Sequence, residues 1–474
     1  SSTVLSDAHS LAKTLRTWFE ANGGWLNPDV VIVYDGSCGF HARASKSLGA
    51  PVIAKCPAQL TLSYLNLDRS QTRVPHVDTP LQSFLGQIPN HVLTYLLLIE
   101  LRQRFFDKQA SLWEPYIACL PGPESMTTPI WFTDEDMAFL QGTNLAQAAV
   151  TTRERWNAEW EHAIDTMEKS GYDKARVYSF EMFCWAATII SSRAFSSDRI
   201  LPDFEKSPIL FPVIDILNHS TKARVDWNFS SYDNFTLASR EEFSTGEELF
   251  NNYAPKQNDE LLLGYGFAIP ENPSEQFAVK IALPLHQEQH YLQMDAFNAK
   301  YVPFGMSAAS LQEDREQNQG FIRTPGNPFG RYDCSLPFLR GIPPYVVHLN
   351  FLATLNSLGI ELDAIDPARP PARVFIKTIL GLYQAVRSKS ERLPLRKIDL
   401  STLANDKQRF AAIYRDGQAK VIYEILKELE APIMKRRVCD QIPGFHPVIT
   451  TTTEALLAFE RDFPAQYALF ETGL

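Results

Sequence analysis

Two short segments near the middle of the chain carry side chains that could do chemistry. The first ends in Asn218 and His219, which place an amide beside an imidazole. The second, residues 250–267, contains Tyr253 and Tyr265, two hydroxyl groups on aromatic rings. Taken alone, an Asn-His pair usually caps a turn, and a tyrosine usually belongs to the core or its rim. Together they suit a site that binds a polar cofactor and encloses a long alkyl-ammonium chain.

The elements that must position these groups read as short strands and buried helices. Residues 180–192 are apolar enough for a buried helix, and residues 235–238 read as a strand between the two segments, followed by a turn at Gly246. Further along, residues 277–281 alternate between apolar and other side chains, which is typical of a half-buried strand. The site is therefore expected in a region of mixed structure.

Changes in residue composition and in the spacing of apolar residues divide the chain into five parts. Residues 1–85 mix a helix with β-rich stretches at 30–34 and 52–55, which are separated by a glycine loop at 36–39. Helical spacing then dominates, mixed structure returns, and a connection rich in Gly, Pro and Gln leads to a helical tail. The expected parts are residues 1–85, 86–175, 176–285, 286–343 and 344–474.

The tail is expected to be a helical domain. Val421, Ile425 and Leu429 recur at helical spacing, and Phe375 and Ile379 do the same. Each set describes a helix with one apolar face. The residues alone give this domain a structural role.

Composition excludes several classes of protein. A chain of 474 residues is too long for one ordinary core, so two or three domains are expected. A net charge of −10 does not favour a nucleic-acid binder, and the chain has no apolar run of membrane-spanning length and no secretory leader. The six cysteines include no CxxC pair, which argues against a zinc cluster or a disulfide framework. No metal is expected, and a reducing compartment fits best.

Several motifs together resemble a known family. They are residues 15–24 (LRTWFEANGG), residues 37–44 (SCGFHARA), residues 113–116 (WEPY) with the Pro-rich stretch after them, residues 192–195 (SRAF), the Asn-His pair and residues 250–267. This ordered set is similar to the SET-domain signature of the Rubisco large-subunit methyltransferase-like, non-histone subfamily. The resemblance covers nearly the whole chain.

The resemblance implies a fold and an activity. The expected fold is α+β, with a strand-rich, pseudoknotted SET core, a helical insertion and a C-terminal all-α substrate-binding domain. The family transfers a methyl group from S-adenosylmethionine, usually to a lysine of a non-histone protein. The partner expected from family frequency is a ribosomal protein or an elongation factor, and the enzyme is expected to be a monomer in the cytoplasm or the nucleus. No nucleic acid and no membrane is expected as a partner.

The resemblance also assigns roles to residues. Tyr253 matches the catalytic tyrosine, and Phe195, Tyr253 and Tyr265 would line the channel for the substrate lysine. The cofactor-binding residues would be Gly39, Phe40, Arg193, Asp215, Asn218 and His219. Arg193 would face the cofactor carboxylate or, alternatively, form a buried salt bridge with Asp215. Asp215 is expected to orient its turn.

Free lysine has a pKa of about 10.4, so a methyl acceptor must be desolvated to lose its proton. The signature contains no poised carboxylate or histidine base, so we expect the proton to leave through water. Positioning of the amine would supply much of the rate.

Two other functions stay open at this point. The family often has an acidic residue where Cys38 stands and a second glycine where His41 stands, so the chain could be a non-catalytic SET-fold adaptor. The chain could also methylate histidine, although relatives with that activity carry a polar residue in place of Phe195. Phe195 therefore favours lysine.

Overall fold

The computed structural model describes residues 2–199, 205–229, 234–317, 320–334, 336–368, 370–393 and 399–441. The chain forms two compact units, each with its own core. Unit 1 comprises residues 1–135 and 145–267, and unit 2 comprises residues 136–144 and 268–474. The division into five parts stays a prediction. Residues 442–474 of the expected tail lie outside the described residues.

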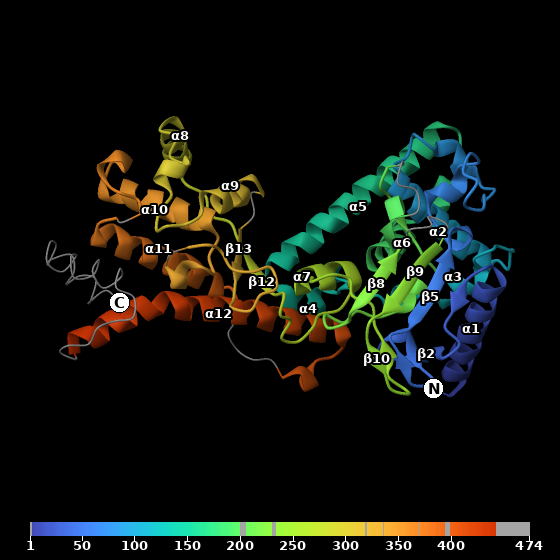
Figure 1. The fold of residues 1–474 in the computed structure, drawn as a ribbon. Helices are drawn as coiled ribbons and strands as arrows, with labels where there is room; N and C mark the ends of the chain where they lie inside the picture. Colours follow the sequence, from blue (N-terminus) through green and yellow to red (C-terminus); the bar gives the residue numbers. More distant parts are fainter. Residues whose placement is uncertain are drawn as a thin grey trace. The chain divides into compact units, whose positions relative to one another are not determined.

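The strands of unit 1 form small antiparallel sheets (Figure 1). A four-stranded sheet has the order β1 (Trp25–Leu26), β5 (Val52–Pro57), β9 (Asn234–Ser239), β8 (Val225–Asn228). A three-stranded sheet has the order β11 (Glu248–Leu249), β3 (Gly39–Ala44), β2 (Val30–Asp35). Two further pairs join β10 (Glu242–Phe243) to β4 (Leu48–Gly49), and β6 (Phe195–Ser196) to β7 (Pro208–Ile209). The first two sheets thus pair strands from the beginning of unit 1 with strands from its end.

The helices of unit 1 pack around these strands. They are α1 (Ser2–Ala21), α2 (Asn90–Phe106), α3 (Glu114–Cys119), α5 (Asn144–Lys169), α6 (Phe180–Arg193) and α7 (Asn258–Glu260), with α4 (Asp134–Met137) at the boundary. The predicted buried helix at 180–192 is confirmed as α6, whose N-terminus is capped by the Ser179 hydroxyl accepting from the Met182 N–H at 3.2 Å. Eight consecutive residues of α6, 183–190, are buried because the helix lies in the core.

The glycine loop near the N-terminus is shorter than predicted. Gly39 begins strand β3, which pairs with β2 so that Asp35 lies opposite Gly39 and Val33 opposite His41. The sequence Gly-Phe-His-Ala-Arg-Ala has few β-branched residues. The strand forms because β2 and β11 supply its hydrogen-bond partners on both sides.

Unit 2 is built mainly of helices. They are α8 (Leu285–Gln293), α9 (Ala308–Gln317), α10 (Pro344–Leu358), α11 (Ala372–Ser390) and α12 (Asp406–Gln441), of which the last three pack side by side (Figure 1). The predicted strand at 277–281 is confirmed as β12 (Gln276–Val279), which pairs with β13 (Gly320–Arg323). The predicted connection therefore contains α8, α9 and β13, and its Tyr291, Tyr301 and Phe304 belong to the core of unit 2.

A short segment that interrupts unit 1 in sequence is tied into unit 2. The buried Asp136 carboxylate accepts hydrogen bonds from Asn405 Nδ2 and Gln408 Nε2, both at 3.0 Å. Arg415 donates to the Phe139 carbonyl at 3.3 Å. None of the helices in the described ranges has the length and apolar character of a membrane span.

Candidate active site

The two segments that carry the candidate groups lie side by side. Asn251 N–H donates to the Asn218 carbonyl at 2.8 Å, and Ser220 N–H donates to the Asn251 carbonyl at 3.0 Å. His219 and Asn251 form a parallel bridge. The approach to Asn218 is sharp, because Val213 has a left-handed φ of 71° just before a turn of 3-10 helix at Ile214–Ile216. The fold thus joins two motifs that are separate in sequence.

Tyr253 lies between two other rings. Its ring stacks on His219 on one side and on Tyr265 on the other, both with centroids 4.9 Å apart. Its hydroxyl donates to the Leu217 carbonyl at 2.6 Å, and its N–H donates to His219 Nδ1 at 2.9 Å. Burial of the hydroxyl raises the pKa of Tyr253, so this residue stays a neutral phenol at physiological pH.

His219 is held as one neutral tautomer. Since Nδ1 accepts from the Tyr253 N–H, the ring proton must lie on Nε2. Burial, followed by the charge of Lys256, lowers the pKa of His219 to about 4. Nε2 is buried and has no hydrogen-bond partner within the described part of the chain. It is therefore a donor available to a bound molecule.

The alternative of an Arg193–Asp215 salt bridge is present in the structure. An Arg193 guanidinium nitrogen lies 3.8 Å from Asp215 Oδ2 and 3.5 Å from the Asp215 carbonyl. The same Oδ2 accepts a hydrogen bond from the Tyr116 hydroxyl. The Asp215 side chain is fully buried, whereas 21% of the Arg193 side chain is exposed. Arg193 can therefore hold Asp215 and still present a surface to a ligand.

Burial raises the pKa of Asp215 to about 6, although Arg193 and Tyr116 oppose this shift. The folded protein therefore favours the protonated carboxyl more than the unfolded chain does. The contribution of the protonated Asp215 carboxyl to stability is present at low pH and is lost as the pH rises through about 6.

We expect the difference in unfolding free energy between wild type and Asp215→Asn to fall by about 2 kcal/mol from pH 4 to pH 7. Urea unfolding of both proteins at several pH values measures it. Asp68→Asn is the control, because hydrogen bonds from Ser70 lower the pKa of Asp68, so its contribution to stability changes only below about pH 4 and its difference should stay nearly constant over this range. A pH-independent difference for Asp215→Asn would contradict the argument.

Asn218 is oriented by a carboxylate. Its Nδ2 donates to Glu248 Oε1 at 2.7 Å, which leaves its side-chain oxygen as the acceptor end. Glu248 also lies 4.0 Å from the Arg43 guanidinium. Glu248 therefore ties the Asn-His segment to strand β3.

Gly39 and Phe40 begin β3. Gly39 has a left-handed φ of 68°, and among the described residues no atom beyond its two chain neighbours lies within 4 Å of where a Cβ would stand. Glycine is therefore suited to the backbone conformation, and that side of the residue is open. The Phe40 ring packs edge-on against Tyr34 at 5.0 Å.

Phe195 lies in an aromatic cluster. Its ring contacts Phe211, Trp227 and Phe235 at centroid distances of 5.2 to 5.4 Å. Trp227 Nε1 donates to Asn251 Oδ1 at 2.9 Å. Phe195 is thus connected to the Asn218–Asn251 pair through Trp227. Its ring packs against these three aromatic rings.

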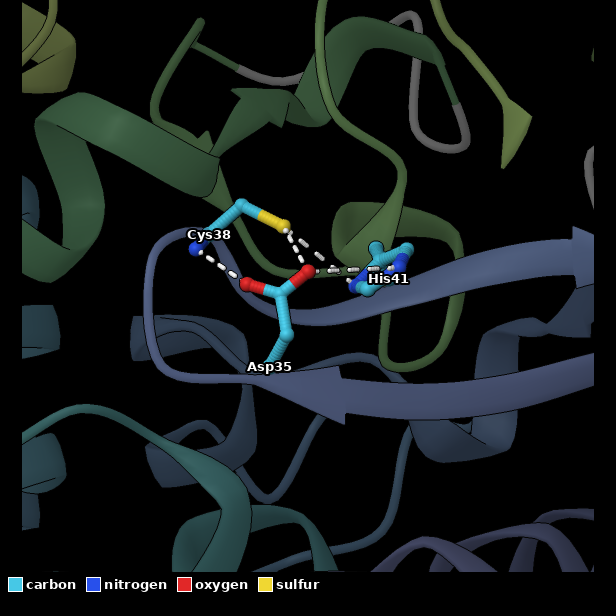
Figure 2. A group of neighbouring side chains, drawn as sticks. All are labelled: Asp35, Cys38 and His41. Atoms are coloured by element: carbon cyan, nitrogen blue, oxygen red, sulfur yellow. Dashed lines mark hydrogen bonds and ion pairs between the residues drawn. The ribbon is translucent and has the colours of Figure 1, made fainter. Parts of the chain in front are cut away.

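The two residues that depart from the family pattern interact with each other. The Cys38 thiol donates to Asp35 Oδ2 at 3.0 Å and lies 3.5 Å from His41 Nδ1 (Figure 2). Partial burial of its sulfur atom beside His41, together with Asp35 and Glu248, raises the pKa of Cys38 to about 12, although the residue as a whole is exposed on the turn. The His41 ring is buried and does not block the open side of Gly39.

Three residues of the site were not anticipated as members of it. Tyr116, Glu248 and Asn251 each hydrogen-bond a predicted site residue or its backbone. Tyr116 belongs to the WEPY motif, and Asn251 stands in the Phe-Asn-Asn-Tyr stretch, so both had a signal. Glu248 had none, because an acidic residue after a glycine turn is ordinary.

Known proteins place this site in a family. The chain is 34% identical over 418 residues to ribosomal lysine N-methyltransferase set10 of Schizosaccharomyces pombe, which covers 85% of this chain and 69% of that protein. It is 28% identical over 283 residues to N-lysine methyltransferase SETD6 of Mus musculus, covering 56% of this chain and 55% of that protein. A solved SET domain of LSMT bound to lysine and AdoHcy has a TM-score of 0.60 at 19% identity, covering 92% of this chain and 97% of that one. No protein-family model matches the chain.

The chain belongs to the SET-domain protein lysine methyltransferases of the Rubisco LSMT-like subfamily. The predicted α+β SET fold is confirmed, as is the predicted activity, S-adenosylmethionine-dependent methylation of lysine side chains of non-histone proteins. This membership favours lysine over histidine methylation and an enzyme over an adaptor.

The residues of the site fit S-adenosylmethionine. Two buried polar atoms, Asp215 Oδ1 and His219 Nε2, have no hydrogen-bond partner within the described residues, and Arg193 keeps an exposed surface. These are an acceptor, a donor and a cation, which complement a ligand with an amine and a carboxylate. When bound, S-adenosylmethionine supplies an electrophilic methyl group.

Proposed function

We propose that this enzyme methylates a lysine side chain of a ribosomal protein, as a monomer, in the cytoplasm or the nucleus. The observation that carries the substrate class is the similarity to set10 over most of both chains. A further relative, ribosomal lysine N-methyltransferase 1 of Saccharomyces cerevisiae, is 39% identical over 115 residues, which cover 23% of this chain and 18% of that protein.

The His219–Tyr253–Tyr265 stack supports the proposed roles at the reacting centre. Tyr253 is the proposed catalytic residue, and Tyr265, Tyr253 and Phe195 are the proposed walls of the lysine channel. The Tyr253 hydroxyl donates its hydrogen bond to the Leu217 carbonyl, so its oxygen lone pairs are available to an approaching amine. Gly39, Phe40, Arg193, Asp215, Asn218 and His219 are the proposed cofactor-binding residues.

Among the described residues, the site contains no side chain that is well placed to deprotonate the substrate amine. His219 uses Nδ1 as an acceptor for the Tyr253 N–H, and Asp215 Oδ2 is occupied by Arg193 and Tyr116, while the buried Oδ1 is the atom proposed to face the cofactor. Neither is free to take a proton from the substrate. Desolvation between the aromatic rings would instead favour the neutral amine, whose proton leaves to water. Positioning then supplies the remaining rate acceleration.

The substrate is tested with ribosomal subunits from cells that lack this enzyme. The full chain and labelled S-adenosylmethionine should label one or a few ribosomal proteins, and mass spectrometry should locate the methyl group on lysine. Subunits from cells that contain the enzyme are the control and should accept little label. Labelling of other lysate proteins with none on ribosomal proteins would contradict the substrate class, and methylhistidine would contradict the residue type.

A further inference from the structure

The turn between β2 and β3 brings three different metal-ligating groups together. Asp35, Cys38 and His41 follow one another at intervals of three residues. Their ligand atoms all lie within 4.8 Å of one another (Figure 2). The Asp35 Oδ2 to Cys38 Sγ distance is 3.0 Å, Sγ to His41 Nδ1 is 3.5 Å, and His41 Nε2 to Oδ2 is 3.9 Å. A carboxylate, a thiol and an imidazole thus converge from one short piece of chain.

These separations suit a tetrahedral ion. Zinc binds sulfur at about 2.3 Å and nitrogen or oxygen at about 2.0–2.2 Å, so neighbouring ligands of a tetrahedral site lie roughly 3.3–3.6 Å apart. The distance from the thiol to Nδ1 of the imidazole already falls in this range. The thiol–carboxylate pair must open by a few tenths of an ångström, and the carboxylate must approach the imidazole, whose other nitrogen, Nε2, lies 3.9 Å from it. Cys38 is exposed on the turn, so this adjustment moves no core residue.

The ligands are also held in place before any ion arrives. Asp35 Oδ1 accepts from the Ser37 N–H at 2.9 Å, the Ser37 hydroxyl at 2.7 Å and the Cys38 N–H at 2.8 Å. This leaves Oδ2 directed at Cys38 and His41. The His41 side chain is 1% exposed and therefore rigid, whereas the exposed Cys38 gives an entry path. Such outer hydrogen bonds orient ligands in known metal sites.

We propose that Asp35, Cys38 and His41 form a binding site for a soft divalent cation, in the first instance Zn²⁺, with a fourth position open to solvent. On binding, a metal–sulfur bond forms and the thiol proton leaves to solvent. The carboxylate and the imidazole each donate a lone pair, and nothing is oxidised or reduced. The sequence contains no CxxC pair, and the three ligands are of three different residue types. No familiar metal-binding motif therefore marks this site in the sequence.

Arg43 is the competitor of the metal. Its Nε donates to His41 Nε2 at 3.0 Å, which leaves the ring proton on Nδ1, where it can be donated to the Gly39 carbonyl 3.0 Å away. An ion on Nδ1 requires that proton to move to Nε2, so the Arg43 contact must break. The Arg43 side chain is 39% exposed, so it can turn away from the imidazole. It keeps a hydrogen-bond partner when it does so, because it also donates to the Gly246 carbonyl at 2.9 Å. Its removal should therefore strengthen metal binding.

The site has a consequence for the enzyme that rests on the proposed function. Gly39 and Phe40, two proposed cofactor-binding residues, lie between Cys38 and His41 in the chain. A bound ion would fix their conformations and so change the affinity for the cofactor. Metal binding itself is measurable without cofactor or substrate, so failure of one proposal is distinguishable from failure of the other.

The test is a titration of the metal-free full chain with Co²⁺, which substitutes for Zn²⁺ and reports a bound thiolate through a near-ultraviolet charge-transfer band. We expect one Co²⁺ per chain, and Zn²⁺ should displace it and abolish the band. Cys38→Ser should remove the band, whereas Cys119→Ser, a matched change of a partly exposed thiol elsewhere in unit 1, should leave it. Asp35→Asn should weaken binding about tenfold or more, since loss of even an outer partner of a metal ligand typically has this effect.

Arg43→Met supplies a readout in the opposite direction, because it should tighten Co²⁺ binding about tenfold by freeing the imidazole and removing a nearby positive charge. Circular dichroism confirms that each variant is folded. A band that survives Cys38→Ser, no band at all, or weaker binding in Arg43→Met would overturn the proposal.

Discussion

Replacing Tyr253 with Phe is expected to lower methyl-transfer turnover by about 100-fold or more while cofactor affinity is retained. The substitution removes one hydroxyl and keeps the ring between His219 and Tyr265. If that hydroxyl steers the amine in the transition state, its loss corresponds to about 2.7 kcal/mol of transition-state stabilisation. Steady-state turnover beside calorimetric cofactor binding measures both quantities.

The same change also affects stability, and a matched control separates the two effects. Without the hydroxyl, the Leu217 carbonyl loses its donor, which costs about 1–3 kcal/mol. Tyr291 makes an analogous bond in unit 2, since its hydroxyl donates to the Leu352 carbonyl at 2.8 Å. Tyr291→Phe should therefore lose comparable stability and keep its turnover. Full activity in Tyr253→Phe, or an equal loss in both variants, would remove Tyr253 from the catalytic role.

The part of the fold that sequence could predict is the part that local patterns determine. The apolar run of α6 and the alternating residues of β12 both reflect burial in a core. Burial requires apolar residues at regular spacing, and this spacing can be recognised in the sequence. Strand β3 left no such record, since its conformation depends on partners from β2 and β11. Long-range pairing therefore explains the strand that the residues themselves did not reveal.

The site divides in the same way. Asn218, His219 and Tyr253 could be selected because they stand in ordered motifs, and the structure brings all three together. The Tyr116–Asp215 hydrogen bond joins residues 99 positions apart, and nothing in either segment predicts it. The Asp35–Cys38–His41 cluster is local in sequence, yet only the hairpin geometry turns its three side chains toward one point.

The roles of Arg193 as a ligand group and as a structural cation can be separated experimentally. Arg193→Met should weaken S-adenosylmethionine binding by about 100-fold, because a charge-assisted hydrogen bond contributes about 1.5–3 kcal/mol. It should also destabilise the fold, since removing one partner of a buried ion pair costs about 3–5 kcal/mol. Protonation of Asp215, whose pKa is already raised to about 6, would reduce that cost at low pH.

Asp215→Asn in the Arg193→Met background distinguishes the two roles. The neutral amide no longer needs a buried cation, so the double variant should recover most of the stability lost by Arg193→Met. Cofactor affinity should not recover, because the group that faces the ligand is still missing. The cycle consists of wild type, the two single variants and the double variant. Chemical unfolding of these four proteins gives the coupling energy for stability, and calorimetric titration gives the coupling energy for cofactor binding. If affinity returned together with stability, Arg193 would act only by holding Asp215 and its turn, and the cofactor carboxylate would have to be bound by another residue.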